Sequence, residues 1–153
     1  MSRPARAKNK TAATWLALLG GQLGLHRFYL YGLTDVWAWL HPILAALGWW
    51  GVERVRFYGQ DDHLAWVLIP LLGFTIAATA LTAIYYGLMA PEKWNARHNR
   101  ATPPAAADTS NWLTVGAVVI ALLIGTVALM SSIVFSFQRY FEYQIEEARK
   151  ISQ

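Results

Sequence analysis

Four side chains that can carry charge or bind a ligand lie close together near the start of an otherwise apolar sequence: His26, Arg27, Asp35 and His41. Arginine is a permanent cation that binds phosphate or carboxylate groups, and Asp35 is near enough in sequence to pair with Arg27. Histidine titrates close to neutral pH. One interpretation is that Arg27, Asp35 and His41 line a polar path of the kind that transport proteins use.

The same segment also fits a structural turn. Glycines precede the His-Arg pair and aromatic residues follow it, and a polar turn anchored by an arginine and two rings needs no ligand. The motif consists of Gly20, Gly21, Gly24, His26, Arg27, Phe28 and Tyr29. A structural turn and a ligand-binding or signal-sensing site therefore both stand as interpretations.

Signals for catalysis are absent elsewhere in the sequence. It has no phosphate loop, zinc-protease helix or nucleophile elbow. It also has no cysteine to serve as a thiolate ligand or a nucleophile. His41 is the only histidine well inside an apolar run, and one histidine does not make a haem or metal site. We therefore expect a protein that is not an enzyme and that holds no metal or cofactor.

Long apolar runs must position these residues. Hydrophobic residues make up 56% of the 153 residues and charged residues only 14%, against roughly 25% charged in soluble domains. Residues 64–90 and 112–137 contain no charged side chain. At about 1.5 Å per residue, each run can cross a hydrocarbon core about 30 Å thick. These two runs predict two membrane-spanning helices.

Two further spans are expected earlier in the chain. Residues 11–31 reach membrane length when Tyr31 is included, so that His26 and Arg27 should lie near the far interface. The second run, 36–52, contains Pro42, which should kink it. The sequence thus predicts an all-α integral membrane protein with four transmembrane helices.

The predicted organisation has four parts. A basic and disordered arm covers 1–10, a helical hairpin covers 11–58, and a second helix pair covers 59–137 with an exposed loop at 91–111. Residues 138–153 should form an amphipathic helical tail with an apolar stripe, which would lie on the membrane surface or pack on a partner.

The positions of the basic residues predict orientation. With alternating spans, more lysines and arginines fall on the amino-terminal side, so we expect both termini, including the tail, in the cytoplasm. The expected location is a plasma membrane of the bacterial inner-membrane type. Because the +4 net charge flanks apolar runs, the expected partner is the lipid bilayer and not nucleic acid.

The turn motif resembles the TM-two domain family, in which two transmembrane helices are joined by a turn bearing Asp-Arg-Phe or His-Arg-Phe. The matching positions are Gly20, Gly21, Gly24, His26, Arg27, Phe28, Tyr29 and Leu30. The likeness covers about residues 8–58, but Tyr31 intervenes before Gly32 and the second helix lacks a clear late acidic residue. The resemblance implies a membrane hairpin and little biochemistry, with links to signalling or peptide binding in some animal members.

Small residues recur at spacings that allow helices to pack closely, including Gly20 with Gly24 in a GxxxG pattern. Such faces serve packing within the chain, a homo-oligomer or a membrane-protein partner. We therefore expect a structural or interaction protein. The alternatives are a subunit of a transport or channel assembly and an accessory subunit of a membrane enzyme.

Overall fold

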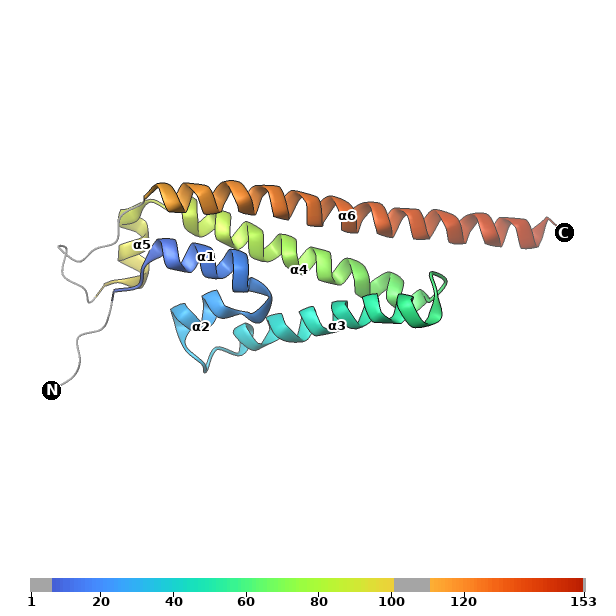
Figure 1. The fold of residues 1–153 in the computed structure, drawn as a ribbon, viewed down its shortest axis with the longest axis horizontal. Helices are drawn as coiled ribbons and strands as arrows, with labels where there is room; N and C mark the ends of the chain where they lie inside the picture. Colours follow the sequence, from blue (N-terminus) through green and yellow to red (C-terminus); the bar gives the residue numbers. More distant parts are fainter. Residues whose placement is uncertain (1–6, 101–110, 153) are drawn as a thin grey trace.

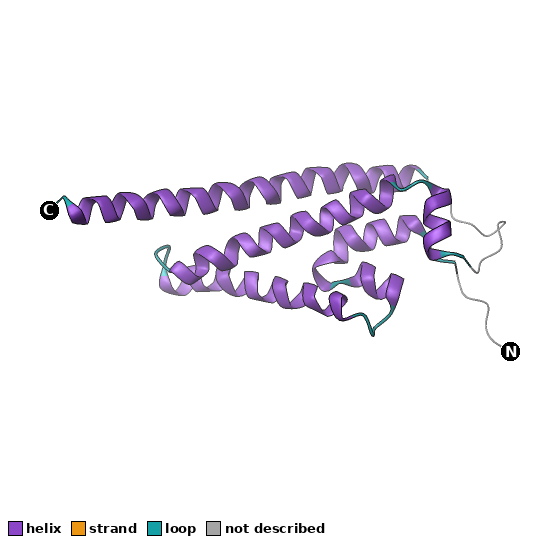
Figure 2. Ribbon diagram, turned by 180° about the vertical axis from the view of Figure 1, so that it is seen from behind, coloured by secondary structure: helices purple, strands orange, loops and turns teal. Residues whose placement is uncertain are grey.

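The computed structural model describes residues 7–100 and 111–152, and within them the fold is all-helical, as predicted. Figure 1 labels the elements and Figure 2 shows the same fold from behind, with helices and loops and no strand among the described residues. The elements in chain order are α1 (Lys10–Gly20), the short 3₁₀ turn η1 (Gly21–Leu23), α2 (Leu25–Tyr31), α3 (Val36–Tyr58), α4 (His63–Leu88), α5 (Pro91–His98) and α6 (Trp112–Ile151).

Helix α4 is the central element, and α6, α3 and α1 all pack against it. Small residues allow these approaches: a side chain at Gly73 would meet Ser132 of α6, and one at Gly125 would meet Ala80 of α4. Among the described residues, α4 and α6 are the two helices that are long and apolar enough to cross a membrane.

The first apolar run does not form a single helix, which corrects the prediction for residues 11–31. Helix α1 ends at Gly20, and after η1 the backbone turns at Gly24, whose φ of 70° is left-handed. Glycine adopts this conformation at little cost. The Lys8 ammonium donates to the carbonyl of Leu30, so the end of α2 lies beside the start of α1. The α1–η1–α2 segment is thus a hairpin that returns to its starting end, and four spans are not supported.

Helix α3 runs antiparallel to α4 and covers the part of α4 that the hairpin leaves free. Gly48 and Gly51 lie against Leu72 and Leu68 of α4, respectively. Near the start of α3, a side chain at Gly24 would collide with the Ala38 carbonyl, so α3 begins beside the tip of the hairpin. Figure 1 shows the hairpin and α3 following one another along α4.

The described chain begins beside α5 and ends with α6 at the opposite end of the bundle (Figure 1). The expectation that both termini lie in the cytoplasm stays a prediction. That expectation required residues 11–31 to cross once. Because they double back, residues 7–10 lie beside α5. Helix α6 then runs without a break to Ile151 at the other end.

Two segments predicted to lack structure are partly ordered. Residues 91–98 of the expected loop form α5, whose Trp94 is fully buried. Lys10 of the expected disordered arm begins α1 and is 1% exposed. Residues 1–6 of that arm and 101–110 of that loop lie outside the described residues.

Candidate functional site

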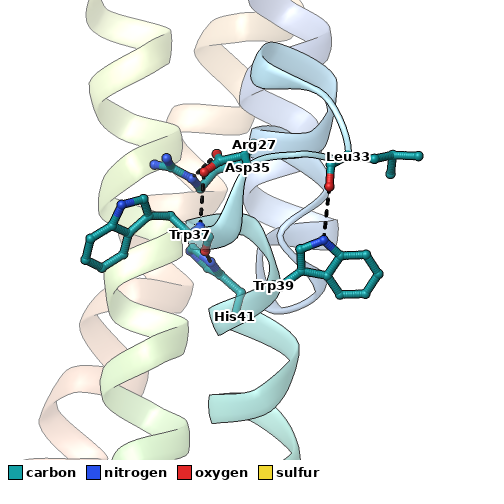
Figure 3. A network of polar contacts seen from close by, with 6 residues as sticks. All are labelled: Arg27, Leu33, Asp35, Trp37, Trp39 and His41. Atoms are coloured by element: carbon teal, nitrogen blue, oxygen red, sulfur yellow. Dashed lines mark hydrogen bonds and ion pairs between the residues drawn. The ribbon is translucent and has the colours of Figure 1, made fainter.

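Arg27 and Asp35 form the ion pair that their proximity suggested. Arg27 Nε lies 2.8 Å from Asp35 Oδ2, and the Arg27 guanidinium carbon lies 5.2 Å from the centre of the Tyr31 ring. The other carboxylate oxygen, Asp35 Oδ1, accepts from the backbone N–H of Trp37 at 3.1 Å and so caps α3. Asp35 therefore ties the hairpin to the first turn of α3 (Figure 3).

The hydrogen bond from the Arg27 guanidinium stabilises the charged form of the Asp35 carboxylate. The pair remains partly open to the surroundings, because 29% of the Arg27 side chain and 10% of the Asp35 side chain are exposed. The two opposite charges of the ion pair neutralise one another.

His26 and His41 lie against each other at the base of the same site. Their ring centres are 5.2 Å apart at an angle of 81°, and the His26 ring is 6.1 Å from that of Tyr86 in α4. His41 Nδ1 donates to the carbonyl of Trp37, 2.9 Å away. His26 is 2% exposed, and its Nδ1 has no hydrogen-bond partner in the described part of the chain.

The loop between α2 and α3 completes the site. Trp39 Nε1 donates to the carbonyl of Leu33 at 3.1 Å, so that the indole holds the turn that precedes α3 (Figure 3). The ring of Phe28 packs edge-to-face on Trp39 with ring centres 5.1 Å apart. The path of the chain into α3 is thus fixed by four residues together, Arg27, Asp35, Trp37 and Trp39.

The glycines of the motif lie at close contacts within the hairpin and between the hairpin and its neighbouring helices. Gly21 lies against Thr79 of α4, where a side chain would collide with the threonine. Tyr29, near the end of α2, accepts at its hydroxyl from the backbone N–H of Asn9 at 2.8 Å. The described residues contain no group of three or more histidine and acidic side chains that could hold a metal ion.

A polar cluster at the tip of the hairpin was not predicted from the sequence. Gln22 Nε2 donates to Thr79 Oγ1 at 3.1 Å, and Thr75 Oγ1 donates to Gln22 Oε1 at 3.0 Å. These bonds join η1 to α4. The signal in the sequence is a lone glutamine inside a glycine-rich apolar run, since such a group needs a partner when it is buried.

A second unpredicted cluster, the amino-terminal clasp, joins Lys8 to Trp94 and Asn99. Asn99 Oδ1 accepts from Lys8 N at 2.7 Å, while Asn99 Nδ2 and Trp94 Nε1 both donate to the Lys8 carbonyl, at 3.1 and 2.9 Å. The sequence does contain a signal for α5. It has Pro91 and Glu92 at the start of the segment and basic residues at its end, a pattern that is typical of a helix.

No protein-family model matches the chain, and no curated protein or solved structure shows significant similarity to it. The resemblance of residues 8–58 to the TM-two domain family therefore stays a prediction.

Proposed function

We propose that the chain is an integral membrane protein of structural or interaction type, which works through helix contacts and not by catalysis. The observation that carries this proposal is the outward display of large apolar side chains along α3, α4 and α6. Trp37, Leu81 and Leu123 are 66%, 65% and 66% exposed. Water-soluble monomers rarely expose continuous apolar surfaces of this kind.

The polar side chains inside the bundle support the same proposal. Thr14, Thr79, Thr114 and Ser132 are all less than 6% exposed. Thr14 and Ser132 donate to carbonyls one turn earlier in their own helices. Apolar residues outside and small hydroxyl residues between closely packed helices are typical of proteins surrounded by lipid.

In the proposed topology α4 and α6 each cross the membrane, and the hairpin and α3, which follow one another along α4, together make a third crossing. Three crossings place the termini on opposite sides. The amino-terminal end of the bundle carries Lys8, Lys10, Lys93, Arg97 and Arg100, and the chain before Ala7 adds Arg3 and Arg6. The other end carries Arg54, Arg56, Arg139, Arg149 and Lys150. The excess of basic residues at the amino-terminal end supports a location of that end in the cytoplasm of a bacterial-type plasma membrane.

Single-cysteine labelling tests the membrane assignment and this topology, since the natural chain has no cysteine. Glu92→Cys in α5 and Ser152→Cys after α6 are both exposed positions. We expect an impermeant maleimide to label Ser152→Cys on intact cells and Glu92→Cys only after lysis. Labelling of both positions from the same side would reject the topology, and release of the protein by alkaline carbonate would reject the membrane assignment.

The interaction role is supported by the end of α6. Ile145 and Ile151 are 55% and 85% exposed on its last turns, which extend beyond the ends of α3 and α4 (Figure 1). An exposed amphipathic helix is suited to a helical partner or to a second copy of the chain. We expect native electrophoresis in mild detergent to show a complex larger than one chain, which Ile145→Ser with Ile151→Ser abolishes. Val119→Ser, at an exposed position within the bilayer, is the matched control; a monomeric wild-type protein would contradict the role.

A transport or channel subunit is the second candidate, favoured by the Arg27–Asp35 pair and the buried His26 beside a broken helix. Such breaks near ionisable groups occur at substrate sites in transporters. Flux in proteoliposomes that is lost in Asp35→Asn and His41→Ala would support this role. An accessory subunit of a membrane enzyme would instead co-purify with that enzyme in the same mild detergent.

A further inference from the structure

A cavity of about 310 Å³ lies between the first turns of α4 and the later part of α6. Its lining consists of His63, Trp66, Ser136, Arg139, Tyr140 and Tyr143. Arg139 is the first charged residue of α6, directly after its uncharged run, and His63 is the first residue of α4. The cavity therefore lies where the apolar part of the bundle meets its polar end.

Arg139 is held rigidly at the cavity wall. Its side chain is 13% exposed, Nη1 lies 2.7 Å from Glu142 Oε2, and Nη2 donates to Gln60 Oε1 at 3.0 Å. The guanidinium carbon also lies 5.5 Å from the centre of the Phe135 ring. A guanidinium has five N–H donors, so these two bonds leave donors for an acceptor in the cavity.

Aromatic rings form the rest of the wall. The His63 ring lies 4.4 Å from that of Trp66 and 5.9 Å from that of Tyr143, measured between ring centres. The Trp66 indole donates to the Gln60 carbonyl at 2.7 Å. Tryptophan and tyrosine with one apolar and one polar edge are enriched at the level of lipid headgroups.

We propose that this cavity binds the headgroup of a phospholipid that carries both a phosphate and a primary ammonium, as phosphatidylethanolamine does; this rests on the proposed membrane location. Arg139 binds the phosphate bidentately or through one N–H, with the phenols of Tyr140 and Tyr143 as further donors. Glu142, whose side chain is 44% exposed, accepts from the ammonium.

The charges around the cavity favour a zwitterionic lipid over an anionic one. Glu142 already neutralises Arg139, so a second anion alone would leave one negative charge in excess. This end of the bundle also carries more acidic than basic residues, because Glu53, Asp61, Asp62, Glu146 and Glu147 lie there as well. A headgroup that brings its own cation keeps the site neutral.

Native mass spectrometry of the purified full chain tests this proposal, with phosphatidylethanolamine, phosphatidylcholine and phosphatidylglycerol added separately. We expect phosphatidylethanolamine to be retained preferentially. In Arg139→Gln its retention should fall on the order of tenfold, which is the effect of losing one charge-assisted hydrogen bond. Arg149→Gln, at an exposed position on the same helix, should retain the lipid like wild type. Tyr140→Phe with Tyr143→Phe should weaken retention even if Arg139→Gln does not fold.

Three results would overturn the assignment: equal retention by both arginine variants, phosphatidylglycerol or phosphatidylcholine bound as well as phosphatidylethanolamine, or displacement of the lipid by millimolar inorganic phosphate. The last would indicate a site for free phosphate. Because membrane location is measured separately by carbonate extraction, a protein that stays in the membrane without retaining the lipid rejects this inference alone.

Discussion

Lys10 Nζ lies 2.8 Å from the carbonyl oxygen of Met89, directly after the last residue of α4. It also lies 3.4 Å from the carbonyl oxygen of Gly87. The last carbonyls of a helix have no partner within the helix and carry partial negative charge, so a buried ammonium stabilises them. The first residue of α1 thus closes the end of α4, and this contact sets where the hairpin begins.

Replacing this ammonium should destabilise the fold. Lys10→Met keeps the length of the side chain but leaves the Met89 carbonyl without its donor. We expect a loss of about 1–3 kcal/mol in the free energy of unfolding, measured by circular dichroism in detergent. Lys93→Met, an exposed position in α5, should leave the unfolding midpoint unchanged. An equal effect from both substitutions would argue against the cap.

Gly24 should not tolerate a side chain. Its φ of 70° costs an L-residue about 1–2 kcal/mol, and a Cβ would collide with the Ala38 carbonyl. Gly24→Ala should therefore lose about 2 kcal/mol or more in stability. Gly116→Ala is the matched control, because nothing lies within 4 Å of a Cβ there. A Gly24→Ala protein as stable as this control would show that the hairpin can turn another way.

The Asp62–Arg54 pair predicts sensitivity to acid. Arg54 Nε and Nη2 lie 2.5 and 3.0 Å from the two Asp62 oxygens, and this hydrogen bonding lowers the pKa of Asp62 below 3.8. A lowered pKa gives stability that is fully present above 3.8 and is lost as the pH falls through the folded value. The thermal unfolding midpoint of wild type should therefore decrease as the pH is lowered below about 4.

Asp62→Asn should have a lower midpoint at neutral pH and a smaller further decrease in acid. Asp61→Asn, at the exposed neighbouring position, should follow the wild-type pH curve. Parallel curves for wild type and Asp62→Asn between pH 6 and 3 would mean that the pair adds nothing to stability.

Breaking the amino-terminal clasp should open the chain to protease. Asn99→Ala removes the two bonds from the Asn99 side chain to the Lys8 backbone. We expect trypsin to cut after Lys8 and Lys10 several times faster than in wild type, with fragment masses as the readout. In Arg100→Ala, at the exposed next position, trypsin should cut at the wild-type rate. Equal protection in both variants would show that Trp94 alone holds the clasp.

The long helices and the ion pair could be predicted from the sequence, whereas the path of the first run could not. Uncharged length alone identifies α4 and α6, and eight residues of separation suggested the pairing of Arg27 with Asp35. Apolar length does not distinguish a crossing from a segment that doubles back. That choice is made by the left-handed turn at Gly24, which lies against Ala38 of α3, and by Gln22, which bonds to α4. Helix α5 was missed because its composition is polar and only Trp94 turns inward.

The doubling back of the hairpin has a consequence for the order in which the protein is made. Residues 10–31 leave the ribosome before α4, and the partners of Gln22 on α4 lie 53 and 57 residues further along the chain. Neither α1 nor α2 is long enough to stay in a bilayer alone. In the proposed membrane topology, the hairpin therefore reaches its place only after α4 has been inserted, although it is synthesised before α4.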